Sequence, residues 1–209
     1  MAGSRQTPPS PRLPRRRARR ALRRWAGLAA ALVLAGVALR FAGRTLLREP
    51  LRPDTDYRIS RVFDGDTIEL EGMYVIRLLG VDTPESWPCR KLERDAARLG
   101  LPESTVMEMG RRADAFVSRL CEGRKARIAF DPVNAPRRHR DIYGRILAYV
   151  FLVDPARPGE EPLFLNRKLV AYGYSRRSNF DFGYRDEWRG LEERARERQY
   201  GLWKFGPLP

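Results

Sequence analysis

Three short β-prone segments follow one another between residues 57 and 79, and they constrain the fold more than any other feature. Tyr57–Val62 and Thr67–Leu70 flank the turn signal Asp64-Gly65-Asp66, which predicts a hairpin or a closely related tight connection. Tyr74–Leu79 is the third β-prone segment, and Pro84 prevents its continuation. The folded part of the chain is therefore expected to begin with three successive strands.

The remaining pattern predicts one helix, two strands and two closing helices, in the order Glu103–Leu120, Ala126–Phe130, Ile146–Val153, Asn166–Tyr172 and Asp186–Gln199. Residues 87–102 are polar and irregular, and they predict a loop with a short helical piece. Residues 132–141 predict a basic loop. This order of elements predicts the α+β class, as a five-stranded OB-type β-barrel with about three helices.

The N-terminus differs in character from the rest of the chain. Residues 1–24 hold nine arginines and no acidic residue, so much of the formal net charge of +15 belongs to this tail. The apolar run Trp25–Leu39 follows, which is short of the roughly 20 residues of a comfortable membrane span. A basic stretch before an apolar run predicts either a transmembrane anchor or a secretory signal. We favour the uncleaved anchor because Gly36-Val37-Ala38 is a poor cleavage site.

The predicted organisation is a basic disordered tail over 1–24, a transmembrane or signal helix within 25–43, a linker over 44–55 and a folded domain over 56–205. Under the anchor interpretation the protein crosses the membrane once, with a cytoplasmic N-terminus and the domain on the exoplasmic side. Under the signal interpretation the domain is secreted after cleavage. We expect a monomer in either case.

The few cysteine and histidine residues exclude several classes of site. His139 is the single histidine, and it cannot form a zinc cluster with only Cys89 and Cys121. Hydrolytic sites that need two histidines are excluded for the same reason. Hydrolysis by this chain must rest on carboxylates and arginines. Spacing leaves open whether the two cysteines form a disulfide or stay separate thiols.

Carboxylates and arginines gather where the predicted strands end. Asp64-Gly65-Asp66 places acids on a tight turn, although Asp-Gly pairs are most often turn residues and nothing more. Arg77 interrupts an otherwise apolar strand, which is costly unless its guanidinium meets an anion. Asp82, Thr83 and Glu85 follow where that strand opens into a loop.

These groups suit the hydrolysis of a phosphodiester. A hard cation with oxygen ligands would suit Asp66, Asp82 and a backbone carbonyl. Arg145 precedes another strand, and with Arg77 it could clamp one phosphate through two guanidinium groups.

Three stretches, RVFDGDTIEL, YVIRLLGVDTPES and DIYGRILAYV, resemble in order and spacing the signature stretches of the staphylococcal nuclease (thermonuclease) family. The resemblance extends from Tyr57 to Trp203. It implies the SNase-like fold, a five-stranded OB barrel with three helices.

The resemblance also implies a role for each matching residue. Asp66 and Asp82 resemble calcium ligands, and Thr83 resembles the residue that offers its backbone carbonyl to Ca²⁺. Arg77, Glu85 and Arg145 resemble the catalytic residues, and Tyr143 resembles a tyrosine that lines the substrate-binding pocket. Asp64 matches an acid that supports the metal site without binding it.

The function implied is a hydrolase, a calcium-dependent endonuclease that acts on DNA and/or RNA and leaves 3′-phosphate ends. Its partners would be the nucleic acid substrate and, through residues 25–43, a membrane. The alternative is a non-catalytic nucleic-acid-binding OB domain tethered to a membrane, which would need the arginines but no calcium pocket.

Overall fold

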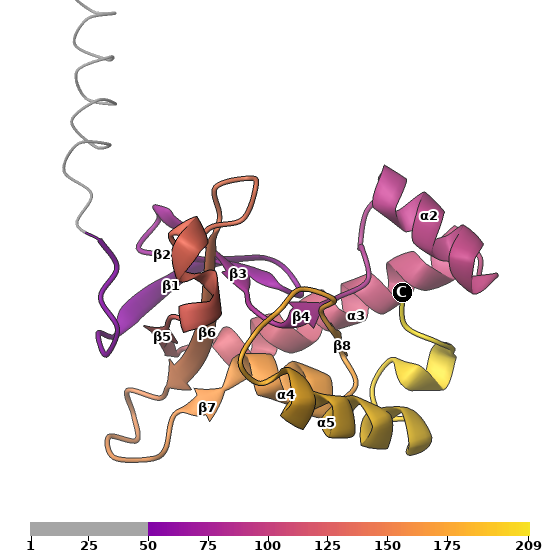
Figure 1. Cartoon of the computed structure of the whole chain (residues 1–209). Coiled ribbons are helices and arrows are strands. Elements are labelled where there is room, and N and C mark those ends of the chain that lie inside the picture. Colours follow the sequence, from indigo (N-terminus) through magenta and orange to yellow (C-terminus); the bar gives the residue numbers. More distant parts are fainter. Residues whose placement is uncertain (1–49) are drawn as a thin grey trace, which may run out of the picture. The chain divides into compact units, whose positions relative to one another are not determined.

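A computed structural model describes residues 50–209 of the protein (Figure 1). The predicted transmembrane or signal segment over 25–43 lies outside these residues, as do the tail and most of the linker, so these assignments remain predictions. Among residues 50–209, no helix combines the length and the apolar content needed to cross a membrane.

Five strands form a closed barrel, which confirms the predicted α+β barrel. They are β1 (Tyr57–Asp64), β2 (Thr67–Leu70), β3 (Tyr74–Leu78), β5 (Lys125–Ala129) and β6 (Ile146–Val153). Their order in the sheet is β3-β2-β1-β5-β6. A parallel pairing of β3 with β6, in which Ile76 lies opposite Ile146, closes the barrel. No edge remains between these two strands.

Three two-residue strands extend this framework, and no pattern in the sequence predicted them. β7 (Leu163–Phe164) pairs with the end of β6. β4 (Val81–Asp82) pairs with β8 (Arg176–Arg177), so that Asp82 lies opposite Arg176. The second pairing brings two segments that are far apart in sequence to the end of the barrel where the acidic residues gather.

The described helices are α2 (Arg90–Leu99), α3 (Glu103–Cys121), α4 (Leu165–Ala171) and α5 (Arg185–Glu197), with two 3-10 turns, η1 (Pro132–Arg137) and η2 (Trp203–Phe205). Three of the α-helices agree with the predicted ones within a few residues. The fourth, α2, is longer than the short helical piece expected in that region. Likewise η1 occupies part of the segment predicted as a basic loop.

The α2 helix is held by caps and by a narrow apolar face. Cys89 Sγ accepts a hydrogen bond from the Leu92 amide, and Gly100 ends the helix in the left-handed region at φ 66°. Leu92 and Ala96, one turn apart, are buried against Val106 of α3. Figure 1 shows α2 beside α3, reached by the chain that leaves β4.

Alternate residues of the strands fill the barrel. Ile68, Leu70, Ile76 and Leu78 are essentially inaccessible to solvent. Burial of each such side chain stabilises the fold by roughly 1.5–3 kcal/mol. The barrel interior therefore fixes the strands whose ends carry the polar residues.

A buried asparagine joins α4 to the barrel. The Asn166 amide donates to the carbonyl oxygens of Leu79 at 2.9 Å and Ala148 at 3.2 Å, and its oxygen accepts from the Val150 amide at 2.8 Å. Because the side chain is fully buried, these bonds satisfy groups that water cannot reach. These bonds hold Leu79, just after the end of β3, in place relative to β6.

Both cysteines are free thiols, so the open question of a disulfide is answered for this structure. Cys89 caps α2, whereas Cys121 is buried at the end of α3. Burial raises the pKa of Cys121 to about 12, so at neutral pH the side chain is a protonated thiol and not a thiolate.

Candidate active site

Four neighbouring segments bring the predicted site residues to one end of the barrel. Asp66 lies on the turn between β1 and β2, and Arg77 lies on β3, opposite Thr67. Asp82 ends β4, and Glu85 follows in the loop that leads to α2. The register of β2 with β3 places the acidic turn beside the guanidinium.

Asp66 is the most enclosed acid of the site, at 6% exposure. Its Oδ1 pairs with the Arg77 guanidinium and accepts from the Thr67 hydroxyl at 3.1 Å. Its Oδ2 accepts from the amide and the hydroxyl of Thr83, at 3.2 Å and 3.0 Å. These donors fix the position of the Asp66 carboxylate.

Asp82 lies among three cationic side chains. Arg176 Nη2 is 2.6 Å from Asp82 Oδ2, and on the other oxygen Lys91 Nζ lies at 3.2 Å and Arg77 Nη2 at 3.6 Å. The carboxylate of Asp82 is therefore paired from both sides.

Lys91, in the first turn of α2, reaches the loop before it. Its Nζ donates to Glu85 Oε1 at 2.9 Å, Asp82 Oδ1 at 3.2 Å and the carbonyl oxygen of Thr83 at 3.3 Å. Burial lowers the pKa of Lys91, but the charges and hydrogen bonds of the two acids outweigh that effect and raise the pKa above its ordinary value. Lys91 therefore carries its positive charge at neutral pH.

Arg145 approaches from the turn before β6. Asp141 holds it, because Asp141 Oδ2 accepts from Arg145 Nε at 2.7 Å and Oδ1 accepts from its backbone amide at 2.9 Å. Arg145 Nη1 reaches the Thr67 hydroxyl at 3.4 Å. Burial lowers the pKa of Arg77, Asp82 opposes that shift, and the like charge of Arg145 adds to it. The Thr67 hydroxyl that Arg145 reaches donates to Asp66 Oδ1, the oxygen that pairs with Arg77, so the two guanidinium groups lie near the same carboxylate.

The backbone amide of Tyr143 donates to Asp141 Oδ1 at 2.9 Å, while its side chain is exposed. It is 78% exposed on the turn before β6, and the Arg145 guanidinium lies 5.5 Å from the centre of its ring. The structure thus places Tyr143 beside one arginine at the rim of the site.

Two glycines allow the backbone around the site to pack closely. A Cβ at Gly65 would lie 2.9 Å from side-chain atoms of both Thr83 and Ala113. A Cβ at Gly110 of α3 would lie 2.4 Å from the carbonyl oxygen of Glu85. The turn that carries Asp66 and the loop that carries Glu85 are therefore both positioned against α3.

Two acids at the edge of the site keep a raised pKa. Burial raises the pKa of Asp64, although Arg77 and hydrogen bonds from Thr67 oppose the shift. Asp64 Oδ1 accepts from the Asp66 amide at 3.0 Å, so it shapes the turn. Burial also raises the pKa of Asp114 on α3, which no sequence pattern marked as part of the site.

The oxygen atoms present suit a hard divalent cation, although the acids are interleaved with cationic side chains. Within residues 50–209, no three side chains of His, Cys, Asp or Glu gather as a metal cluster by themselves. Asp82, Glu85 and the Thr83 carbonyl nevertheless surround one cation already, the ammonium of Lys91. Oxygen donors of this kind are the ligands that Ca²⁺ prefers, and Asp82 and the Thr83 carbonyl belong to the predicted calcium set. The third predicted ligand, Asp66, pairs with Arg77 and accepts from the Thr83 amide, so it lies beside this set.

Sequence reasoning missed Lys91 and Arg176. The sequence signal for the helix that carries Lys91 is the apolar pair Leu92 and Ala96 before Gly100, which predicts a short helical piece but not the whole of α2. Arg176 and Asp82 are 94 positions apart in sequence, and no local pattern predicts their contact.

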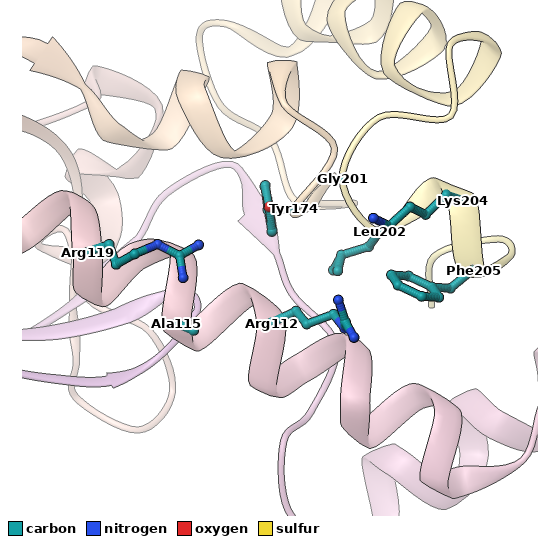
Figure 2. Close-up of a pocket in the computed structure, with 8 residues that line it drawn as sticks. All are labelled: Arg112, Ala115, Arg119, Tyr174, Gly201, Leu202, Lys204 and Phe205. Atoms are coloured by element: carbon teal, nitrogen blue, oxygen red, sulfur yellow. The ribbon is translucent and has the colours of Figure 1, made fainter.

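A separate hollow of about 140 Å³ lies between α3 and the C-terminal segment (Figure 2). Arg112, Arg119 and Lys204 line it together with Tyr174 and Phe205. None of the predicted catalytic or metal-binding residues is among its lining residues. Arg77 and Lys91 instead contact the acids of the predicted site.

Comparison with known proteins bears on the whole domain. The family of staphylococcal nuclease homologues matches residues 75–205. An uncharacterised protein of Methanocaldococcus jannaschii is 32% identical over 154 residues, which cover 71% of each chain. The thermonuclease of Staphylococcus hyicus is 28% identical, over 70% of this chain and 75% of its own length. The thermonuclease of Staphylococcus intermedius is 30% identical, over 71% and 76%. The chain belongs to the staphylococcal nuclease homologue family.

Proposed function

We propose that the domain is a calcium-dependent endonuclease that hydrolyses phosphodiester bonds of DNA and/or RNA. The observation that carries this proposal is that Arg77 contacts Asp66 and Asp82, while Arg145 reaches the Thr67 hydroxyl, which donates to the same Asp66 oxygen that pairs with Arg77. Two thermonucleases among the relatives support nuclease activity in general.

The two arginines would bind the reacting phosphate. Each keeps part of its guanidinium fixed by an acid, Arg77 by Asp66 and Arg145 by Asp141. The remaining N–H groups of each are available for phosphate oxygens, where negative charge grows in the transition state. Since phosphate contacts carry no base information, we expect slight sequence preference.

Glu85 would accept a proton from the attacking water, as a general base. Asp66, Asp82 and the Thr83 carbonyl would hold Ca²⁺, which supplies positive charge against the phosphate when bound. The family resemblance favours attack that leaves 3′-phosphate ends.

Digestion of single-stranded DNA and of RNA by the full-length chain tests the proposal, with Ca²⁺ and with a chelator. We expect cleavage with Ca²⁺ and a loss of at least about 100-fold in the chelator. End analysis of the products would show 3′-phosphates. Cleavage at equal rates in both conditions would refute the calcium dependence.

Conservative variants test the individual roles. We expect Glu85→Gln and Arg145→Lys each to lower kcat by about 100-fold or more, because each removes a group used in the transition state. Glu187→Gln and Arg167→Lys are matched controls, since these residues form an exposed ion pair at 2.9 Å elsewhere on the domain. Full activity of Glu85→Gln or Arg145→Lys would contradict the assignment.

The same experiments separate catalysis from simple binding. A non-catalytic binding domain would hold nucleic acid in the chelator with a strong dependence on salt, and it would release no products. That outcome would replace the nuclease proposal by the binding function.

We also propose that residues 25–43 place the domain on the exoplasmic side of a membrane, as an anchor or as a cleaved signal. The proposal rests on the arginines before the apolar run. Fractionation of cells and the N-terminal residue of the mature protein test it. Recovery of the intact chain from the soluble cytosol would contradict both forms.

A further inference from the structure

Lys91 contacts two of the three groups that the proposed function gives to a calcium ion, Asp82 and the Thr83 carbonyl, and it also contacts Glu85, the proposed general base. Its ammonium group has three N–H donors, and the three oxygens that it contacts come from Asp82, Thr83 and Glu85. Every donor of Lys91 is therefore used within this set. No other lysine of the described domain contacts these acids.

The helix that carries Lys91 is anchored independently of this contact. Leu92 and Ala96 bury the apolar face of α2, and Cys89 caps its first turn. The lysine side chain itself keeps 32% exposure. Its flexible stem can therefore swing towards solvent while the backbone of α2 stays in place.

The Lys91 ammonium and a divalent ion cannot occupy this oxygen set together. Three oxygens that surround one point hold one cation there, because a second would meet both steric overlap and charge repulsion. Asp82 would remain oriented after Lys91 leaves, since Arg176 holds its other oxygen at 2.6 Å. Asp82 is thus held in the same place whether the ammonium group of Lys91 or a divalent ion is bound.

We infer that Lys91 is a tethered cation that competes with Ca²⁺ for the carboxylates of this site. The inference rests on the proposed function, because it concerns the same ion. Without Ca²⁺, Lys91 neutralises Asp82 and Glu85 and stabilises the loop between β4 and α2. When Ca²⁺ binds, Lys91 must be displaced, and the apparent calcium affinity is lowered by the free energy of its contacts.

Hydrogen bonds between charged groups contribute enough binding free energy to make this competition measurable. Two charge-assisted bonds, to Asp82 and Glu85, are lost when the ion displaces Lys91. Because Lys91, Asp82 and Glu85 are all partly exposed, solvent screening reduces the stabilisation that these hydrogen bonds provide. We expect removal of the ammonium to tighten calcium binding by about ten- to 100-fold.

Calcium titration calorimetry of the full-length chain, without nucleic acid, tests the inference. Lys91→Met removes the charge and keeps the apolar stem, and we expect its Kd for Ca²⁺ to fall by about tenfold or more. Lys91→Arg keeps the charge and should bind close to wild type. Arg94→Met makes the same charge change on the exposed side of α2, where Nε contacts only the Arg90 carbonyl, and should change Kd less than threefold.

A melting experiment gives a second readout that does not depend on activity. Without Ca²⁺, Lys91→Met should melt below wild type, because Asp82 and Glu85 lose a neutralising partner. Saturating Ca²⁺ should raise the melting temperature of Lys91→Met more than that of wild type. Circular dichroism would confirm that the variant is folded.

The possible failures are distinct. Equal Kd values for wild type and Lys91→Met would overturn the competition while leaving calcium binding intact. Weaker binding by Lys91→Met would also overturn it, and would assign Lys91 a supporting role. Absence of calcium binding in every variant would overturn both this inference and the calcium dependence of the proposed function.

Discussion

Gly110→Ala should destabilise the protein, although the same change normally stabilises a helix. In the middle of a helix, alanine is favoured over glycine by up to about 1 kcal/mol. Gly110 lies inside α3, where a Cβ would stand 2.4 Å from the carbonyl oxygen of Glu85 and 2.6 Å from the amide nitrogen of Ser86. Ordinary contacts begin at 3.4 Å, so the loop must move by about 1 Å.

The atoms that must move are backbone, which cannot turn aside as a flexible side chain does. Overpacking of this kind costs about 1–3 kcal/mol, which exceeds the gain in helix propensity. We expect the free energy of unfolding to fall by about 1–2 kcal/mol. A shift of about 1 Å at Glu85 should also lower kcat by up to about 100-fold, on the proposed role of this residue.

Gly190→Ala in α5 is the matched control. Its Cβ would meet only the far end of the Arg194 side chain, at 3.3 Å. We expect this variant to gain about 0.5–1 kcal/mol in the free energy of unfolding and to keep full activity. Urea denaturation and a nuclease assay measure both quantities. A Gly110→Ala protein as stable and as active as wild type would refute the argument.

Further predictions concern stability, pH and substrate. Asn166→Ala should lower the free energy of unfolding by about 2–4 kcal/mol in urea, because it leaves the Leu79 carbonyl and the Val150 amide buried without this partner. Burial raises the pKa of Asp131, but hydrogen bonds from Tyr149, Gly183 and Val133 outweigh burial and lower it below its ordinary value. The ionised Asp131 therefore stabilises the fold above the ordinary aspartate pKa, and this stabilisation is lost as the pH falls through the lowered pKa. Asp131→Asn should therefore be less stable than wild type at pH 7. In an acid titration below about pH 4, the variant should lose less stability than wild type, because it has no Asp131 carboxylate to protonate. Tyr143→Ala should raise KM while the melting temperature stays constant, since the side chain is 78% exposed.

The barrel was predictable because its signals are local. The acidic turn at Gly65 separates two β-prone segments, and the strand that carries Arg77 ends where Pro84 forbids its continuation. Strand register then brings Arg77 beside the turn, since Thr67 pairs with Arg77. Residues near strand ends thus converge once the strands are correctly ordered.

The contacts made by α2 and β8 were not predictable in the same way. The apolar face of α2 consists of little more than Leu92 and Ala96, which is too narrow to mark a helix of ten residues clearly. β8 has two residues, and it is fixed by its pairing with β4 rather than by any propensity of its own. The partners of Asp82 from these two elements therefore depend on tertiary structure.

On the proposed function, the donor geometry of the cations explains why the arginines can remain in place when Ca²⁺ binds while Lys91 must leave. A guanidinium has five N–H donors in a fixed plane, and Arg77 meets Asp66 and Asp82 with only part of them. Arg145 likewise contacts Asp141 and Thr67, and it has other donors, which the proposed function gives to a phosphate. Both are preorganised for an anion by the acids that hold them. Lys91 has three donors, and two of them contact Asp82 and the Thr83 carbonyl, which the proposed function gives to Ca²⁺, so on that proposal the ion can bind only when Lys91 leaves.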